Sequence, residues 1–210
     1  MRDFFAVLDE TRRPWLEPDR LKATFLRLSS EVHPDRLHTA PPKERETANQ
    51  RHIEINAAYS GLAGLKERLS HLVLLEAGRP PRKVESIPAD IAERFIEVGR
   101  ICGEADRLLA RAGEVVSPVV KVEIVTAALD LGDRLEKMVH DLSQPIASIE
   151  GELRSMNAAW ESAPRIGEPG RLEQLPLVRL EDLYRRVAYL DKCGQQLRER
   201  ATKLSIYCAS

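Results

Sequence analysis

The tripeptide His33-Pro34-Asp35 places an imidazole and a carboxylate on either side of a proline. Proline has no N–H to donate and disfavours helical geometry at the residue before it, so we expect a helix to end at about Val32. The tripeptide would then form an exposed turn in which His33 and Asp35 lie close together. Such a turn, with cations beside it, suits the recognition of charge on another protein. The cationic neighbours are Lys22, Arg27 and Arg36.

A helix stop followed by a plain turn is the alternative interpretation, since chance places this tripeptide in a chain of this length on the order of 1 % of the time. The residues on either side favour a binding motif. Before the tripeptide, a stripe at intervals of four, three and four contains Leu21, Phe25, Leu28 and Val32. After it, a similar stripe contains Ala48, His52, Ile55, Tyr59 and Leu62. The two stripes predict an antiparallel helical hairpin that carries the tripeptide in its connecting loop.

The first part of the chain resembles the J domain of DnaJ-type co-chaperones. Besides the tripeptide, the matching residues are Asp3-Phe4-Phe5 with Leu8, Ile55-Asn56-Ala57-Ala58-Tyr59 with Leu62, and then Arg68, Leu72, Leu74, Leu75 and Gly78. The Ile-Asn-x-Ala-Tyr run, followed by a helix that ends in Leu-Leu and Gly, resembles the HscB type, which serves iron–sulfur cluster assembly. The resemblance implies that His33, Pro34 and Asp35, with Lys22, Arg27 and Arg36, bind a DnaK/HscA-type chaperone.

Composition describes an ordinary folded protein with room for one sizeable core or two small domains. The chain has 210 residues, of which 43 % are hydrophobic, 31 % charged and only 5 % aromatic. Cores built from Leu, Ile, Val and Ala favour helices, so we expect an all-α fold. The 32 basic and 33 acidic residues give a formal net charge of -1, and therefore no general reason to expect nucleic acid or an anionic membrane as partner.

The residue types that carry catalysis or bind metal are not grouped in this sequence. The cysteines Cys102, Cys193 and Cys208 form no Cys-x-x-Cys pair, and their odd number suits a reducing compartment. We find no nucleophile with a neighbouring base and no glycine-rich phosphate loop, so we expect neither enzyme activity, nor a metal, nor a cofactor. Without a signal peptide or an apolar run near the ~20 residues of a membrane helix, we expect a cytoplasmic protein.

A break in composition at 78–83, rich in Gly, Pro, Arg and Lys, ends at Pro88 and predicts a domain boundary. We expect a J domain over residues 1–78, a linker over 79–89 and a client-binding helical domain over 90–210. Helical periodicity in this last part predicts a bundle of three or four antiparallel helices. One of the predicted buried faces consists of Val119, Val122, Thr126, Leu129, Met138 and Leu142. Pro145 either kinks that helix or begins a new one behind Ser143 as its cap.

The second half also resembles HscB, in the run 186–192 of its last predicted helix. The resemblance implies that the first helix of this half binds an iron–sulfur scaffold protein through Phe95, Ile96 and Glu97. Burial of Phe95 or Ile96 in the bundle is the alternative, because adjacent helical positions differ by about 100°. Where that helix usually continues with a second glutamate and an arginine, this chain has Arg100 and Cys102.

Taken together, the resemblances imply a co-chaperone that stimulates the ATPase of a DnaK/HscA-type chaperone and delivers an iron–sulfur scaffold protein to it. The charge reversal at Arg100 leaves open a co-chaperone for a different client, since a reversed charge weakens an existing contact. A structural helical adaptor with a degenerate J domain is a further alternative.

Overall fold

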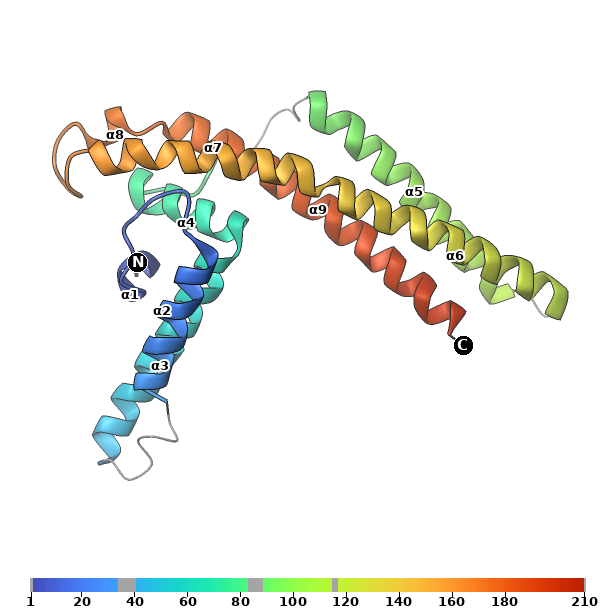
Figure 1. Ribbon diagram of the computed structural model, residues 1–210, viewed down its shortest axis with the longest axis horizontal. Coiled ribbons are helices and arrows are strands. Elements are labelled where there is room, and N and C mark those ends of the chain that lie inside the picture. The colour runs from blue at the N-terminus through green and yellow to red at the C-terminus, as the bar shows by residue number, and fades with distance from the viewer. Residues whose placement is uncertain (1, 34–40, 83–88, 115–116, 210) are drawn as a thin grey trace. The chain divides into compact units, whose positions relative to one another are not determined.

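The computed structural model describes residues 2–33, 41–82, 89–114 and 117–209. Within these ranges every regular element is a helix, as expected from the sequence (Figure 1). The helices are α1 (Phe4–Val7), α2 (Pro18–Glu31), α3 (Pro42–Ala63), α4 (Leu65–Ala77), α5 (Ala89–Glu114), α6 (Pro118–Asp141), α7 (Ser143–Ser162), α8 (Arg171–Gln174) and α9 (Leu177–Cys208).

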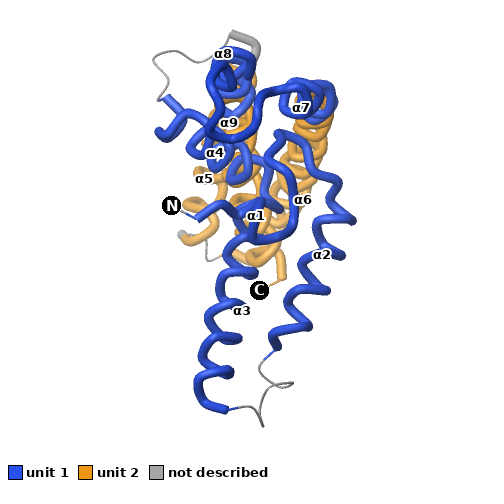
Figure 2. The backbone as a smooth tube through the Cα atoms, turned by 90° about the vertical axis from the view of Figure 1, so that its left-hand side faces the viewer, with its two compact units in different colours: residues 1–83, 150–184 blue, residues 84–149, 185–210 orange. Residues whose placement is uncertain are grey.

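The helices form two compact units that do not follow chain order (Figure 2). Unit 1 combines residues 1–83 with 150–184, and unit 2 combines residues 84–149 with 185–210. The long helices α7 and α9 therefore supply residues to both units. A J domain over 1–78, a linker over 79–89 and a separate domain over 90–210 stay predictions.

Helices α2 and α3 pack against each other, and α1 packs against α3. Helix α2 has proline at its first position, and Val32 is its C-cap, where the sequence predicts that the helix ends. Leu21 and Leu28 are buried on its inner face, and the ring of Phe25 stacks on that of Tyr59 at a centroid distance of 4.2 Å. The hairpin predicted from the two apolar stripes is therefore present, with its connecting loop outside the described residues.

The short helix α1 is held at its start by Asp3 and His71. The Asp3 carboxylate accepts the N–H of Phe5 at 3.0 Å, which caps the helix. The N–H of Phe4 donates to Nε2 of His71 on α4 at 3.1 Å, and the two rings stack with centroids 4.3 Å apart. Helix α1 is thus fixed to α4 by a hydrogen bond that requires an unprotonated Nε2.

The segment 150–184 supplies polar partners to side chains from the first 83 residues. Asn157 accepts the N–H of Trp15 and donates to its carbonyl, both at 3.0 Å, and the Arg154 guanidinium lies 4.4 Å from the Trp15 ring centroid. Arg171 donates to both carboxylate oxygens of the buried Glu76, at 2.8 and 2.6 Å. Unit 1 therefore depends on contacts between residues that are far apart in the sequence.

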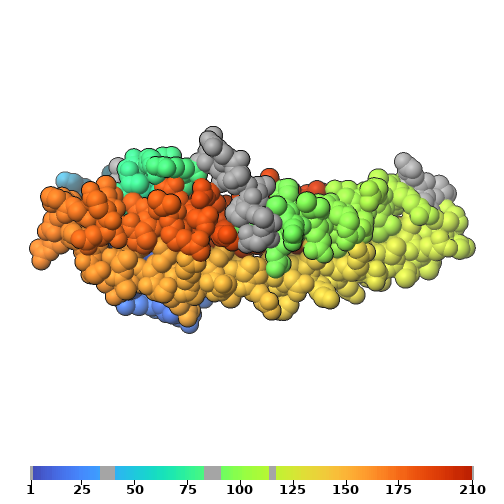
Figure 3. Space-filling model, turned by 90° about the horizontal axis from the view of Figure 1, so that it is seen from above, coloured from blue at the N-terminus to red at the C-terminus, as the bar shows by residue number. Residues whose placement is uncertain are grey.

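Unit 2 contains α5, α6 and parts of α7 and α9, and α5 and α6 lie side by side (Figure 3). The predicted buried face of α6 is wrong in its first half, because the exposed fractions of Val119, Val122 and Leu129 are 70 %, 67 % and 57 %. The face that packs contains Ile124, Ala128, Leu131 and Leu135. Both faces of α6 carry aliphatic residues at helical spacing, so periodicity alone does not identify the packed one.

Pro145 is accommodated in the first turn of a new helix. Helix α6 ends at Asp141 and α7 begins at Ser143. Leu142 between them keeps helical torsion angles, donates to the carbonyl of Met138 and accepts the N–H of Ile146. A missing N–H at Pro145 leaves no partner unsatisfied, because the first-turn N–H groups of a helix have no intrahelical acceptor.

Candidate functional site

The first candidate site lies at the end of α2, where His33 leaves the helix. His33 is exposed, and its ring meets that of His52 on α3 edge to face, with centroids 5.9 Å apart. The amide of Asn56 lies 3.3 Å from the ring nitrogens of His52. The other predicted residues of this loop, Pro34, Asp35 and Arg36, lie outside the described residues.

Arg27, one of the predicted chaperone-binding cations, is engaged by two carboxylates. Its Nη2 donates to Oδ2 of Asp9 at 3.0 Å, and its Nη1 donates to Oε1 of Glu31 at 2.9 Å. These hydrogen bonds, the one to Glu31 being the larger cause, raise the pKa of Arg27 above its usual value. Arg27 thus remains cationic, but carboxylates of this chain surround its charge.

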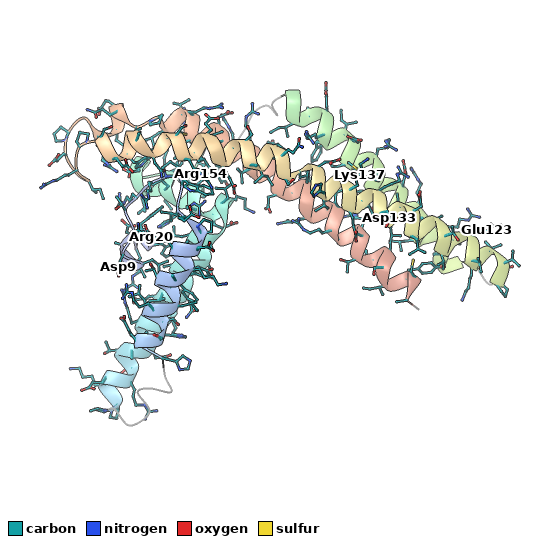
Figure 4. All side chains as sticks on the ribbon, in the orientation of Figure 1. Asp9, Arg20, Glu123, Asp133, Lys137 and Arg154 are labelled. Carbon is teal, nitrogen blue, oxygen red and sulfur yellow. The ribbon has the colours of Figure 1, made fainter. Side chains whose placement is uncertain are left out.

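The neighbouring arginine on the same face of α2 is paired as well. Arg20 precedes Arg27 by seven residues, about two helical turns, so both project from one side of α2. The Arg20 Nε lies 3.3 Å from Oε1 of Glu10, and Asp9 and Arg20 lie near each other beside α2 (Figure 4). The predicted residue Lys22 is exposed, and its position differs from that of Arg27 by about 140° around the helix. The structure therefore separates Lys22 from Arg27.

The second candidate site is the exposed side of α5, which the resemblance assigns to a client. Ile96 has an exposed fraction of 72 %, and Glu97 is also exposed. Phe95 is half-buried, with the Lys192 ammonium 5.8 Å from its ring centroid. The structure therefore leaves Ile96 and Glu97 open to a partner, whereas Phe95 is partly covered by α9.

Beyond Glu97, Arg100 and Glu104 of α5 are paired within unit 2. Arg100 hydrogen-bonds Glu104, and the other oxygen of Glu104 accepts from Arg134 of α6 at 3.0 Å. Cys102 is buried, so it contributes nothing to the exposed face, and burial is the largest cause that raises the pKa of its thiol. Of the two residues that differ from the HscB pattern, Arg100 thus belongs to a surface ion pair and Cys102 belongs to the core.

Sequence reasoning missed Asp9, Glu10, Arg20 and His52 as neighbours of the candidate site. The available signal was the pair of adjacent acids that follows the first helix, together with two arginines seven residues apart on the next helix.

Among the described residues, no group of three or more His, Cys, Asp and Glu side chains is placed to hold a metal ion. In the same ranges, no helix combines the length and apolar character needed to cross a membrane.

Comparisons with known proteins identify relatives among co-chaperones named HscB. No family model matches the chain. The Co-chaperone protein HscB homolog of Aeromonas salmonicida (strain A449) is 38 % identical over 60 residues, which cover 29 % of this chain and 35 % of that protein. The matched region thus spans about a third of the length of that curated relative.

Two solved structures match almost the whole chain. Chaperone HscB from Vibrio cholerae matches with a TM-score of 0.56 and 17 % identity, covering 97 % of this chain and 99 % of that one. The human co-chaperone protein HscB matches with a TM-score of 0.57 and 16 % identity, covering 94 % of this chain and 81 % of that one. The chain therefore has the all-helical HscB fold along nearly its entire length, which confirms the resemblance seen in its sequence.

Proposed function

We propose that this protein is an HscB-type co-chaperone that stimulates the ATPase of a DnaK/HscA-type chaperone and delivers an iron–sulfur scaffold protein to it. The observation that carries the proposal is the presence of His33-Pro34-Asp35 directly after α2 in a chain with the HscB fold along nearly its entire length.

The proposed action needs no bond-breaking step in this chain. The tripeptide, together with Lys22, Arg27 and Arg36, would bind the chaperone, and Asp35 would pair with a cation on it. A co-chaperone that binds one conformation of a two-state chaperone more tightly than the other shifts its population toward that conformation. ATP hydrolysis would then take place within the chaperone, and this chain would act as a non-catalytic regulator.

The Asp35→Asn variant tests this function, because it removes the charge and keeps the size of the side chain. We expect the variant to lose the stimulation of ATP hydrolysis while its far-UV circular dichroism and thermal midpoint stay those of the wild type. The measurement is the steady-state ATPase rate of a purified HscA-type chaperone with increasing amounts of the chain. Asp133→Asn, an exposed position on α6 of unit 2, is the matched control. Full stimulation by a folded Asp35→Asn protein would rule the mechanism out.

The client half of the proposal is tested by calorimetric titration of the iron–sulfur scaffold protein into the full chain. Because Ile96 is largely exposed, Ile96→Ala removes contact area without opening a cavity, and we expect it to weaken binding about ten-fold. Phe95→Ala is the second variant, with a measurement of its stability, because the half-buried Phe95 also contributes to packing. Ile206→Ala, at another exposed position of unit 2, should bind as the wild type does. Equal affinities for all variants would place the client elsewhere.

A co-chaperone for a different client is favoured by one observation on α5. Arg100, Glu104 and Arg134 form a linked set of ion pairs, so the face beyond Glu97 lacks the free acidic character that the resemblance implies. Chaperone stimulation by a chain that fails to bind the scaffold protein would support this second candidate. Loss of both activities would instead support a structural adaptor.

A further inference from the structure

The cations of α2 are largely neutralised by carboxylates of the same chain. Arg27 contacts Asp9 and Glu31, and Arg20 contacts Glu10. Lys22 has no ion-pair partner within the ranges that the structure describes. The helix and the connection before it carry as many carboxylates as cations: Arg12, Arg13, Arg20, Lys22 and Arg27 against Asp9, Glu10, Glu17, Asp19 and Glu31. An acidic partner would therefore meet a surface with little net positive charge.

Asp9 differs from Glu31, the other carboxylate on Arg27, in its position and backbone conformation. It lies after α1, in the connection to α2, and it adopts a left-handed conformation with φ of 53°. Aspartate and asparagine tolerate this conformation better than most residues, so Asp9→Asn removes the charge and retains the backbone. The exposed fraction of its side chain is 60 %, and that of Arg27 is 54 %, so a partner can reach both ends of the pair.

We propose that Asp9 is an internal competitor for Arg27, which weakens and tunes the electrostatic contact between α2 and an acidic surface of the chaperone. This inference rests on the proposed co-chaperone function. A carboxylate of the chaperone that pairs with Arg27 would compete for its guanidinium with Asp9, as well as with Glu31. Because exposed ion pairs are weak and exchange readily, Asp9 lowers the affinity without preventing the contact.

The competition predicts a salt-dependent gain when the Asp9 charge is removed. In full-length protein, Asp9→Asn should lower the concentration needed for half-maximal ATPase stimulation of a purified HscA-type chaperone about two- to five-fold at about 50 mM salt. The gain should vanish at about 0.5 M salt, where exposed charges are screened over a few ångströms. The maximal stimulation should not change, because the tripeptide is untouched.

Two further variants separate local pairing from net charge. Asp133→Asn changes the net charge equally at an exposed position of unit 2 and should leave the half-maximal concentration unchanged. Arg27→Gln should remove the gain when combined with Asp9→Asn, because the competitor and the cation form one pair. An Asp9→Asn protein that behaves as the wild type, or that gains no more than Asp133→Asn, would overturn the inference alone. A wild-type chain without any stimulation would overturn the proposed function and this inference with it.

Discussion

His71 couples the protonation of one imidazole to the position of α1. Its Nε2 accepts the N–H of Phe4, and its ring lies between α4 and the Phe4 ring. Burial is the largest cause of the shift and lowers the pKa of His71. The charge of Asp3 raises this pKa and the charge of Arg12 lowers it, both by less than burial does. The folded protein therefore keeps this imidazole neutral at a pH where an unfolded chain begins to protonate it.

Because the pKa of His71 is lowered in the folded protein, its contribution to stability should decrease as the pH falls. The unfolded imidazole titrates near pH 6.5, so the His71 contribution is complete above that pH and falls as the pH drops toward the folded pKa. We expect the difference in free energy of unfolding between the wild type and His71→Gln to shrink from pH 7.5 to pH 5.5, measured by urea titration. A difference that stays constant with pH would contradict the role of His71.

At this scale, the sequence identified side-chain types better than their partners. Lys22, Arg27 and the tripeptide could be selected because proline ends a helix and because charged residues fall outside an apolar stripe. Their pairing could not, because Asp9 and Glu10 approach α2 only after α1 has packed on α3 and α4. Arg171 and Glu76 illustrate the same difficulty, since 95 residues separate the two members of a buried ion pair.

The helical glycines Gly61 and Gly99 differ in the space available for a side chain. A Cβ at Gly61 of α3 would lie 2.6 and 2.7 Å from atoms of the Phe4 ring, whereas a Cβ at Gly99 of α5 meets nothing within 4 Å. Gly61 therefore allows α1 to approach α3 closely. Gly99 has no such packing role in unit 2.

We expect Gly61→Ala to destabilise the protein and Gly99→Ala to stabilise it. Overpacking costs about 1–3 kcal/mol, which exceeds the gain of up to about 1 kcal/mol in helix propensity that alanine brings. At Gly99 only the gain applies. Thermal unfolding followed by circular dichroism should show shifts of opposite sign, and shifts in the same direction would show that Phe4 moves aside at little cost.

The end of α2 at Val32 could be predicted because Pro34 disfavours helical geometry at the residue before it. The packed face of α6 could not, because Val119, Val122 and Leu129 follow helical spacing as well as Ile124 and Leu131 do. Sequence periodicity reports that a face is apolar, whereas packing depends on which face meets α5 and α9. Helix α6 has two apolar faces, and only the tertiary structure shows which of them is packed.

At the scale of the molecule, each unit is assembled from separate parts of the chain. The composition break at 78–83 predicted a boundary there, but no local signal announces that residues 150–184 pack with the first 83. Trp15 and Glu76 show the consequence, because the backbone partner of Trp15 is Asn157 and the cation on Glu76 is Arg171. Local composition indicates where a domain boundary falls, but it does not show which distant segment packs against the residues before that boundary.

A fragment of residues 1–83 should therefore be less stable than the same residues in the full chain. Without residues 150–184, Glu76 loses its ion pair with Arg171, and Trp15 loses its cover from Asn157 and Arg154. We expect a lower urea midpoint for the fragment and a red-shifted emission from Trp15, its single tryptophan. Adding an excess of the peptide 150–184 that carries Trp160→Phe, so that Trp15 stays the single tryptophan, should partly reverse both changes. A fragment as stable as the full chain would show that the first 83 residues form an autonomous domain.

Because residues 150–184 pack with the first 83, unit 1 cannot be completed during synthesis until those later residues have left the ribosome. Glu76 leaves the ribosome well before Arg171, and the 95 residues between them take about 5–20 s to synthesise at ~5–20 residues per second. During that interval the carboxylate of Glu76 and the ring of Trp15 lack their final partners. The nascent N-terminal half is thus expected to remain incompletely packed, and open to chaperones or proteases, until most of the chain has been made.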